Sequence, residues 1–303
     1  MVLTCVPDAR LSLGIEITKY NVSIVTVNLL GAVIRLQHFP VTYQKSESYY
    51  SKLGMLIENY IRDASMDRKK ILGIGIGVQG LLSSDGKTIT FGKILGSTGE
   101  TLSSYAEHIS FPCRLYHDAN AAAFAEMWIS DHIQNAIYLS LGNNIGGSVF
   151  IDGRPYAGTN ACSGLVEHMT LVPNGKPCYC GQRGCMESYC TAQTLLEGTE
   201  ESLEEFFCLL RSGEPSHQKK WEDYLYHLSI AVNNLHMLFD CDIILGGHIG
   251  AYIGENLKIL KQMAAKRNSF KQEADYLKLC NYTTEAVAAG AAMRYVDEFL
   301  KAI

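Results

Sequence analysis

The chain has 303 residues, of which 47% are hydrophobic and 19% charged, and its formal net charge is −5. This balance gives no electrostatic footprint for nucleic acid, and the length is typical of about two domains. The first residues lack the basic and apolar regions of a secretory signal, and no apolar run approaches the roughly 20 residues of a membrane span. The ten cysteines form no disulfide framework. We therefore expect a soluble cytoplasmic protein with free thiols.

Short β-branched runs open the chain, and the polar or glycine breaks between them predict an antiparallel meander. A helix follows, in which Leu53, Ile57 and Ile61 share one face. The next run alternates isoleucine with glycine, and glycines in a buried strand indicate close backbone packing or the approach of a ligand. The strands predicted for this half cover residues 11–17, 22–28, 32–37 and 71–78.

The second half begins in the same way, with predicted strands at 136–141 and 147–153 on either side of a glycine-containing turn. The stretch from Gly213 to Gln218 is expected to be a loop between helices. A long amphipathic helix follows it, ends near Phe239 and leads into a buried strand at 243–245. The last helix, from about 285 to 300, is rich in alanine and glycine, which allows close packing. Two halves that both start strand–turn–strand predict an internally duplicated α/β fold with a ligand-binding cleft between its lobes.

Three cysteines and a histidine lie within twenty residues of one another, and they are His168, Cys178, Cys180 and Cys185. Sulfur and imidazole are ligands that Zn²⁺ prefers, and a Cys₃His set leaves no open position for catalysis. The spacing therefore predicts a structural zinc site that fixes His168 and Glu187 near one another, with Cys190 outside it. The alternative is a reduced cysteine-rich loop without a metal.

The order of several motifs resembles the ROK family, named for repressors, open reading frames and kinases. These motifs are Tyr116 to Glu126, Gly146-Gly147, Gly158-Thr-Asn160, His168, the cysteine cluster that ends in Glu187, and Leu245-Gly-Gly247. The resemblance implies a two-lobed actin/hexokinase-like (ribonuclease H-like) duplicated α/β fold with a central cleft and a structural zinc loop. We expect an N-terminal lobe at 1–118, a C-terminal lobe at 119–284 with the zinc loop at 168–187, and a helix at 285–303 that packs back on the N-terminal lobe.

The resemblance also implies a sugar site. Asp118 matches the catalytic base of the family, which takes the proton from the attacking sugar hydroxyl; the alternative is a helix-capping aspartate. His117 stands where the family has a sugar-contacting asparagine, and Leu165 replaces a sugar-binding glutamate. Adjacent Glu167 is a poor substitute for that glutamate. The expected sugar-binding residues are Gly80, His117, Asp118, Asn120, His168 and Glu187.

Both phosphate loops of the family are altered in this chain. The first, Asp-x-Gly-x-Thr, corresponds to the stretch Gly14-Ile-Glu-Ile-Thr-Lys-Tyr20, in which Glu16 could stand for the aspartate, and the second, Gly-Thr-Gly, to Gly142-Asn-Asn-Ile-Gly-Gly147. Phosphoryl transfer depends on the positioning of the phosphates and the neutralisation of their charge. Alteration of both loops together should therefore severely reduce kinase activity. Lys19 either replaces a phosphate ligand or is a solvated lysine at a strand end. The residues expected to hold a nucleotide, if one binds, are Glu16, Thr18, Asn143, Gly146 and Gly247.

This pattern resembles the sugar-sensing regulator branch of the family. We expect a protein that binds a sugar or sugar phosphate, lacks kinase activity and controls carbohydrate-metabolism genes as a homodimer or larger oligomer. Too few residues precede the first predicted strand for a helix-turn-helix domain, so this chain should not bind nucleic acid itself. The alternatives are an ATP- and Mg²⁺-dependent hexose or N-acetylhexosamine kinase, and an interaction protein that inherited the fold.

Overall fold

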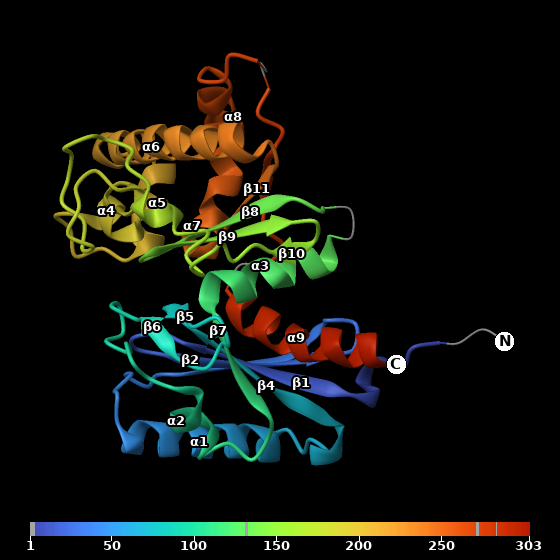
Figure 1. Cartoon of the computed structure of the whole chain (residues 1–303). Coiled ribbons are helices and arrows are strands. Elements are labelled where there is room, and N and C mark those ends of the chain that lie inside the picture. The colour runs from blue at the N-terminus through green and yellow to red at the C-terminus, as the bar shows by residue number, and fades with distance from the viewer. Residues whose placement is uncertain (1–3, 131–132, 271–272, 283) are drawn as a thin grey trace. The chain divides into compact units, whose positions relative to one another are not determined.

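The computed structural model describes residues 4–130, 133–270, 273–282 and 284–303, which form two compact units. Unit 1 comprises Met1–His132, Ala157–Cys162 and Thr284–Ile303, and unit 2 comprises Ile133–Tyr156 and Ser163–Thr283. Each contains a five-stranded sheet (Figure 1), with the strand order β3-β2-β1-β4-β7 in unit 1 and β10-β9-β8-β11-β12 in unit 2. The two sheets repeat one topology, which confirms the duplicated α/β fold. The expected domain limits and cleft stay predictions.

The sheet of unit 1 combines an antiparallel meander with two parallel strands. Strands β1, β2 and β3 pair antiparallel, whereas β4 and β7 run parallel to β1. The predicted strands at 11–17, 22–28 and 71–78 are confirmed, and the third strand extends further than expected. A small hairpin, β5 and β6, stands apart from this sheet. The bounds are β1 Leu11–Ile17, β2 Val22–Asn28, β3 Val33–Phe39, β4 Ile71–Val78, β5 Leu81–Leu82, β6 Ile89–Phe91 and β7 Cys113–His117.

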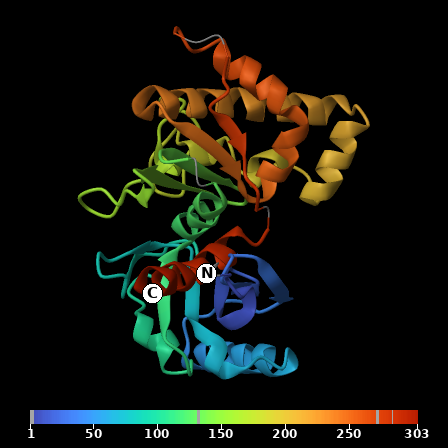
Figure 2. The same cartoon turned by 90° about the vertical axis from the view of Figure 1, so that its right-hand side faces the viewer.

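The helices of unit 1 cover both faces of its sheet. Figures 1 and 2 place α9 (Ala286–Ala302) on one face and α1 (Glu47–Asp63) on the other, and α3 (Asp118–Ile129) packs against α9. A Cβ atom on Gly14 would lie 1.7 Å from the Ala288 carbonyl oxygen, and one on Gly75 would lie 2.1 Å from that of Ala291. The strand glycines therefore serve close packing of α9. The remaining helical elements of unit 1 are η1 Pro7–Ala9, η2 Arg68–Lys70 and α2 Leu102–Ala106.

The sheet of unit 2 is covered by helices that place aromatic side chains in its core, and α6 is the longest of them. Its core includes Phe206, Phe207 and Trp221, from α5 and α6. Helix α6 begins at Pro215, inside a stretch expected to be a loop, because proline suits the first position of a helix. The bounds are β8 Ala136–Leu141, β9 Ile145–Ile151, β10 Arg154–Pro155, β11 Asp242–Gly246, β12 Leu277–Leu279, η3 Val166–His168, η4 Met186–Ser188, α4 Ala192–Leu196, α5 Leu203–Arg211, α6 Pro215–Phe239, α7 Gly247–Ile253, η5 Gly254–Asn256 and α8 Leu257–Ala265.

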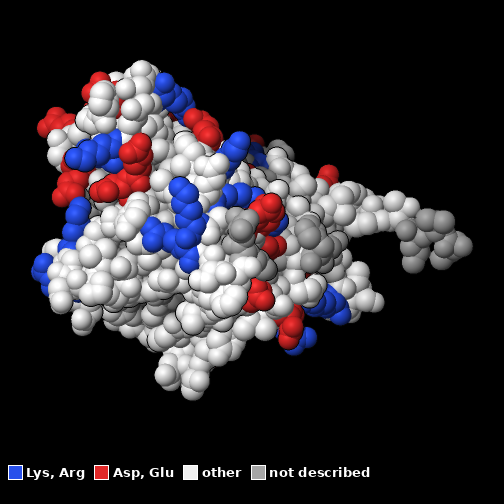
Figure 3. All heavy atoms as spheres, turned by 90° about the horizontal axis from the view of Figure 1, so that it is seen from above, with Lys and Arg blue, Asp and Glu red and all other residues white. Residues whose placement is uncertain are grey.

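Charged side chains of both signs are interspersed with uncharged ones on the face shown in Figure 3. Within the described residues, no helix is both long and apolar enough to cross a membrane.

Candidate functional site

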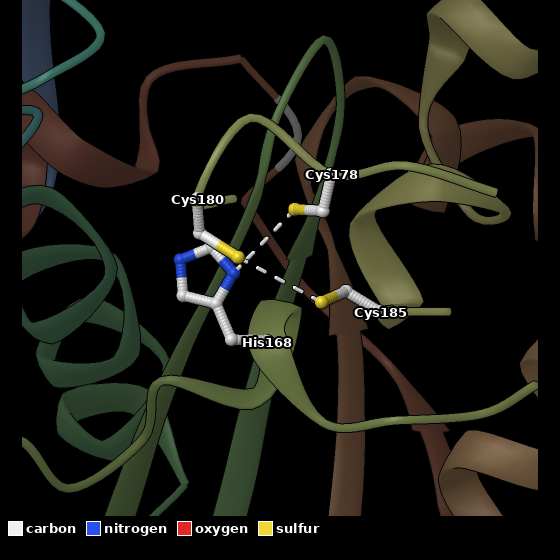
Figure 4. A group of neighbouring side chains, drawn as sticks. All are labelled: His168, Cys178, Cys180 and Cys185. Carbon is white, nitrogen blue, oxygen red and sulfur yellow. Dashed lines mark hydrogen bonds between the residues drawn. The ribbon is translucent and has the colours of Figure 1, made fainter. Parts of the chain in front are cut away.

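The cysteine–histidine cluster of unit 2 is assembled in the structure as its spacing predicts. The side chains of His168, Cys178, Cys180 and Cys185 point toward one another (Figure 4), and their ligand atoms all lie within 4.8 Å of one another. The Sγ atoms of Cys180 and Cys185 are 3.8 Å apart, as are Cys178 Sγ and His168 Nδ1. In a tetrahedral site with Zn–S bonds of about 2.3 Å, two sulfurs lie about 3.8 Å apart. The four side chains therefore have the spacing that a zinc ion needs.

The burial of these sulfurs also suits a metal. Cys185 is fully buried, and burial, followed by the neighbouring thiols, raises its pKa to about 12. Without a cation this sulfur would be a neutral thiol at pH 7, and a bound divalent ion would displace its proton. The chain leaves the cluster through η4, whose Met186 is fully buried in the core of unit 2. Cys190 lies outside the cluster, fully buried in the same core.

His168 presents its two ring nitrogens to different neighbours. Its Nδ1 atom faces Cys178, whereas its Nε2 atom lies 3.9 Å from the Oε1 atom of Glu167. The ring also meets the ring of Tyr179 edge-on, with centroids 5.3 Å apart. Glu167 is buried, and its carboxylate lies beside the His168 ring, whereas its value as a substitute for the family glutamate stays a prediction. A role for His168 in both metal and sugar binding stays a prediction.

Glu187, expected to bind sugar, is held between the metal loop and the β8–β9 turn. It is 7% exposed, and its Oε1 atom accepts a hydrogen bond of 2.8 Å from the side-chain amide of Asn144. Its Oε2 atom accepts one of 2.8 Å from the backbone N–H of Ile145. Burial raises the pKa of Glu187, and these two hydrogen bonds oppose that rise. Asn144 was not among the site residues predicted from the sequence. The available signal was that Asn144 lies in the stretch that corresponds to the second phosphate loop of the family, Gly-Thr-Gly.

Asp118, the expected base, lies in unit 1 where β7 ends and α3 begins. Its Oδ1 atom accepts a hydrogen bond of 2.8 Å from the Ala119 backbone N–H and lies 3.3 Å from Nε2 of His117. Asn120 is exposed on the first turn of α3. Gly80 follows the end of β4, and a Cβ there would lie 2.8 Å from the Phe91 carbonyl oxygen. Since β1, β4 and β7 are parallel, these residues lie at the carboxyl edge of the sheet, where α/β proteins bind ligands.

Glu16 occupies the position of the acidic residue in the first phosphate loop of the family. It is the penultimate residue of β1 and pairs with Gly77 of β4, which in turn pairs with Tyr116 of β7. Burial, and then the negative charge of Asp118, raises the pKa of Glu16 to about 8. At neutral pH this side chain is mostly protonated, which makes it a weak ligand for Mg²⁺.

The β1–β2 turn that follows Glu16 is closed by its own hydrogen bonds. The Thr18 hydroxyl donates to the Asn21 carbonyl oxygen at 3.1 Å and accepts from the Asn21 backbone N–H at 3.2 Å. The Lys19 ammonium lies 5.3 Å from the centroid of the Tyr20 ring, and both side chains are exposed. This placement agrees with the solvated-lysine alternative. The turn therefore uses internally the hydroxyl that was expected to hold a nucleotide.

The three other residues expected to hold a nucleotide lie in unit 2. Asn143 is exposed in the β8–β9 turn, and Gly146 lies in β9 opposite Ser140. Gly247 begins α7 with a φ of +77°, and a Cβ there would lie 2.5 Å from the Leu141 carbonyl oxygen. Glycine at position 247 therefore allows α7 to approach the end of β8. These residues gather around the β8–β9 turn within unit 2.

A family model described as ROK family matches residues 12–297. The chain belongs to the ROK family. A putative xylose repressor of Caldicellulosiruptor sp. (strain Rt8B.4) is 26% identical over 284 residues, which cover 86% of this chain and 71% of that protein. The glucokinase of Halalkalibacterium halodurans is 26% identical over 208 residues, which cover 65% of this chain and 61% of that protein. The ROK relatives thus include regulators and kinases, and the comparison does not decide between them.

Solved ROK structures confirm the fold. A ROK family transcriptional regulator, described as a homologue of the E. coli MLC protein, has a TM-score of 0.81 at 21% identity, covering 97% of this chain and 80% of that one. The ROK hexokinase of Thermus thermophilus has a TM-score of 0.78 at 24% identity, covering 97% of this chain and 100% of that one. At these identities the likeness establishes the hexokinase-like fold and nothing finer.

Proposed function

We propose that this ROK chain binds a sugar or sugar phosphate and acts in the control of carbohydrate-metabolism genes, without kinase activity. The observation that carries the proposal is that hydrogen-bonding groups at both phosphate-loop positions are already used within the protein. The Thr18 hydroxyl closes its own turn, and the Asn144 amide and the Ile145 N–H bind Glu187. A triphosphate would have to displace these bonds before it could be held.

The two carboxyl groups at the carboxyl edge of the unit 1 sheet, those of Glu16 and Asp118, support the same conclusion. A kinase needs Mg²⁺ to neutralise the charge that develops on the transferred phosphoryl group. Glu16 is mostly protonated at neutral pH because of its burial and the nearby charge of Asp118, so it offers Mg²⁺ little attraction. The sugar side keeps more of its polar groups, since Asp118, His117 and Asn120 remain together at the start of α3. Sugar binding without phosphoryl transfer fits this asymmetry.

We propose further that His168, Cys178, Cys180 and Cys185 hold one structural zinc ion. All four sites would be filled by protein, so the ion would supply a cross-link and no catalytic water. Elemental analysis of protein purified without chelator should find one zinc per chain, and a finding of none would contradict this proposal. Cys208→Ser, an exposed thiol of α5 in the same unit, is the matched variant that should keep its zinc.

The kinase alternative has one observation in its favour. Asp118 lies at the carboxyl end of a parallel strand with His117 beside it, which is a suitable place for a general base. The glucokinase among the relatives makes this alternative worth a direct test. If it holds, ATP and Mg²⁺ would be the cofactors, and Glu16, Thr18, Asn143, Gly146 and Gly247 would contact the nucleotide.

Two assays on the full chain separate the candidates. Titration calorimetry with pentoses, hexoses, N-acetylhexosamines and their phosphates should show one ligand class that binds, and Asp118→Asn should weaken it. ATP consumption with the same panel should stay at the rate measured without sugar. Steady consumption with one sugar, abolished by Asp118→Ala, would make the protein a kinase. An absence of both binding and turnover would favour the interaction protein.

We also propose that the protein is cytoplasmic and forms a homodimer or a larger homo-oligomer. Light scattering at micromolar concentration should give at least twice the mass of the chain, and a monomer would contradict this part of the proposal.

A further inference from the structure

Glu187 connects two segments of unit 2 that are distant in sequence. It lies two residues after Cys185 of the metal cluster, and its carboxylate binds Asn144 and Ile145, which lie 43 and 42 residues earlier. The other end of the same turn is held by a neighbouring residue of the later segment, since the Ala192 N–H donates to the Gly142 carbonyl oxygen at 2.8 Å. Residues 187–192 therefore fasten the β8–β9 turn at both ends.

The position of Glu187 depends in turn on the metal loop. Residues 169–185 contain no helix or strand, and the loop is closed by the isolated bridges Thr170↔Cys185 and Pro177↔Arg183. The Met186 N–H donates to the Met169 carbonyl oxygen at 2.9 Å. Backbone hydrogen bonds such as that from the Gly184 N–H to the Lys176 carbonyl oxygen, at 2.8 Å, also hold the loop, and the four metal ligands would cross-link it when a metal is bound.

We propose that Glu187 is a positioning residue through which metal occupancy of the cluster orders the β8–β9 turn. Filling the cluster fixes Cys185, which fixes Glu187, and Glu187 then holds Asn144 and Ile145 with its two carboxylate oxygens. This inference rests on the zinc proposal above, and it adds that the metal acts on the turn expected to contact a nucleotide.

Coupling between two sites is reciprocal, which gives the proposal a second, independent consequence. If zinc orders the turn, loss of the turn's contact with Glu187 must weaken zinc binding by a corresponding factor. Asn144→Ala removes one of the two hydrogen bonds and should lower zinc affinity about fivefold or more. Asn143→Ala is the matched control, because Asn143 is the adjacent residue of the same turn and its side chain is exposed.

Hydrogen exchange tests the forward direction on the full chain. Peptides that cover residues 142–151 should exchange faster after zinc is removed with a chelator. In the zinc-loaded protein, Glu187→Gln should cause the same change while the zinc content stays at one per chain. Glutamine presents an N–H₂ group where the glutamate has an oxygen, so one of the two donors at Asn144 and Ile145 loses its acceptor.

The effect of the turn on zinc binding is tested by measuring zinc affinity in competition with a chromophoric chelator. This measurement does not depend on the metal-free protein remaining folded. Zinc that binds with equal affinity to the Asn143→Ala and Asn144→Ala variants would overturn the coupling. So would unchanged exchange at 142–151 in the zinc-loaded Glu187→Gln variant. A protein that takes up no zinc even when the metal is added would overturn both this inference and the zinc proposal, whereas the first two results leave the zinc proposal intact.

Discussion

The β1–β2 turn of unit 1 and the β8–β9 turn of unit 2 occupy equivalent places in two sheets of the same strand order, yet they are held differently. The first is closed by hydrogen bonds between Thr18 and Asn21, and its Lys19 carbonyl oxygen also accepts a hydrogen bond of 2.9 Å from the Tyr43 N–H. The second relies on Glu187 and Ala192, which come from a later segment next to the metal cluster. The first turn therefore combines hydrogen bonds of its own with one from elsewhere in unit 1, whereas the second relies on residues next to the metal cluster.

The covering layers of the two units differ in a similar way. In unit 1, α3 and α9 approach each other through small residues, and a Cβ on Gly290 would lie 1.7 Å from the Ala121 carbonyl oxygen. In unit 2, large rings stack, such as those of Phe207 and Tyr252, whose centroids are 3.9 Å apart. The contact of α3 with α9 in unit 1 therefore depends on close backbone packing, whereas the contact of Phe207 with Tyr252 in unit 2 depends on ring stacking.

The largest expected effect is the loss of one ligand from the metal cluster. Cys180→Ser should remove zinc and destabilise unit 2 by more than about 3 kcal/mol, because metal binding energy becomes folding energy in such sites. Hydrogen exchange should show lost protection in β8 and β9, with the strands of unit 1 unchanged. Cys208→Ser should keep both zinc and stability, since that thiol is exposed on α5. Equal destabilisation by Cys180→Ser and Cys208→Ser would contradict a special role for the metal cluster in the stability of unit 2.

A second substitution tests the close packing in unit 1. Gly290→Ala places a methyl group against the backbone of α3, so the two helices must separate. Overpacking of this kind costs about 2–3 kcal/mol, and denaturant unfolding should detect it. Lys301→Ala on the same helix should change the free energy of unfolding by less than about 0.5 kcal/mol, because its side chain is exposed. An unchanged free energy of unfolding in Gly290→Ala would show that α3 and α9 can accommodate a methyl group between them.

The regular elements of both units could be predicted from the sequence, since their apolar residues follow the period of a strand or a helix. Strands β1, β2, β4 and β8 appeared at the expected bounds, and the final helix matched α9 to within two residues. The start of α6 was missed because Pro215 looked like a loop residue, although proline is well suited to the first turn of a helix. Short elements such as α4 and β12 carry too few residues for a recognisable period.

The candidate sites were predictable to different extents. The assembly of the cysteine–histidine cluster followed from local spacing, because its three cysteines lie within one short loop. The contact of Glu187 with Asn144 joins residues 43 positions apart and leaves no local signal. The raised pKa of Glu16 arises from burial within the folded sheet and from Asp118 on another strand end, neither of which a sequence pattern records.

The raised pKa of Glu16 can be tested by measuring stability as a function of pH. The folded-state pKa of about 8 lies above the ordinary value of 4.5, so the folded protein binds more protons than the unfolded chain between these limits. Stability should therefore fall as pH rises through this window. Glu16→Gln removes the titration, so its stability advantage over the natural protein should grow as pH rises through this window.

Chemical denaturation at intervals from pH 5 to pH 8.5 measures that advantage. Glu222→Gln, at an exposed glutamate of α6, serves as the control. An advantage for Glu16→Gln that stays constant across this range would mean that Glu16 is ionised throughout. It would then be a competent ligand for Mg²⁺, which would favour the kinase alternative.

The smallest expected effect separates the two turns directly. Thr18→Ala removes both hydrogen bonds that the hydroxyl makes with Asn21 and should lower the free energy of unfolding by about 1 kcal/mol, whereas Thr18→Ser keeps the hydroxyl and should cost less. Because the residues that hold this turn, Tyr43 included, belong to unit 1, the loss should be the same with and without zinc. The loss caused by Asn144→Ala should instead shrink when zinc is removed, since Glu187 is then no longer held in place. Calorimetric melting of the two variants with and without chelator measures both differences, and a Thr18→Ala effect that changes with zinc would show that the first turn also depends on the metal loop.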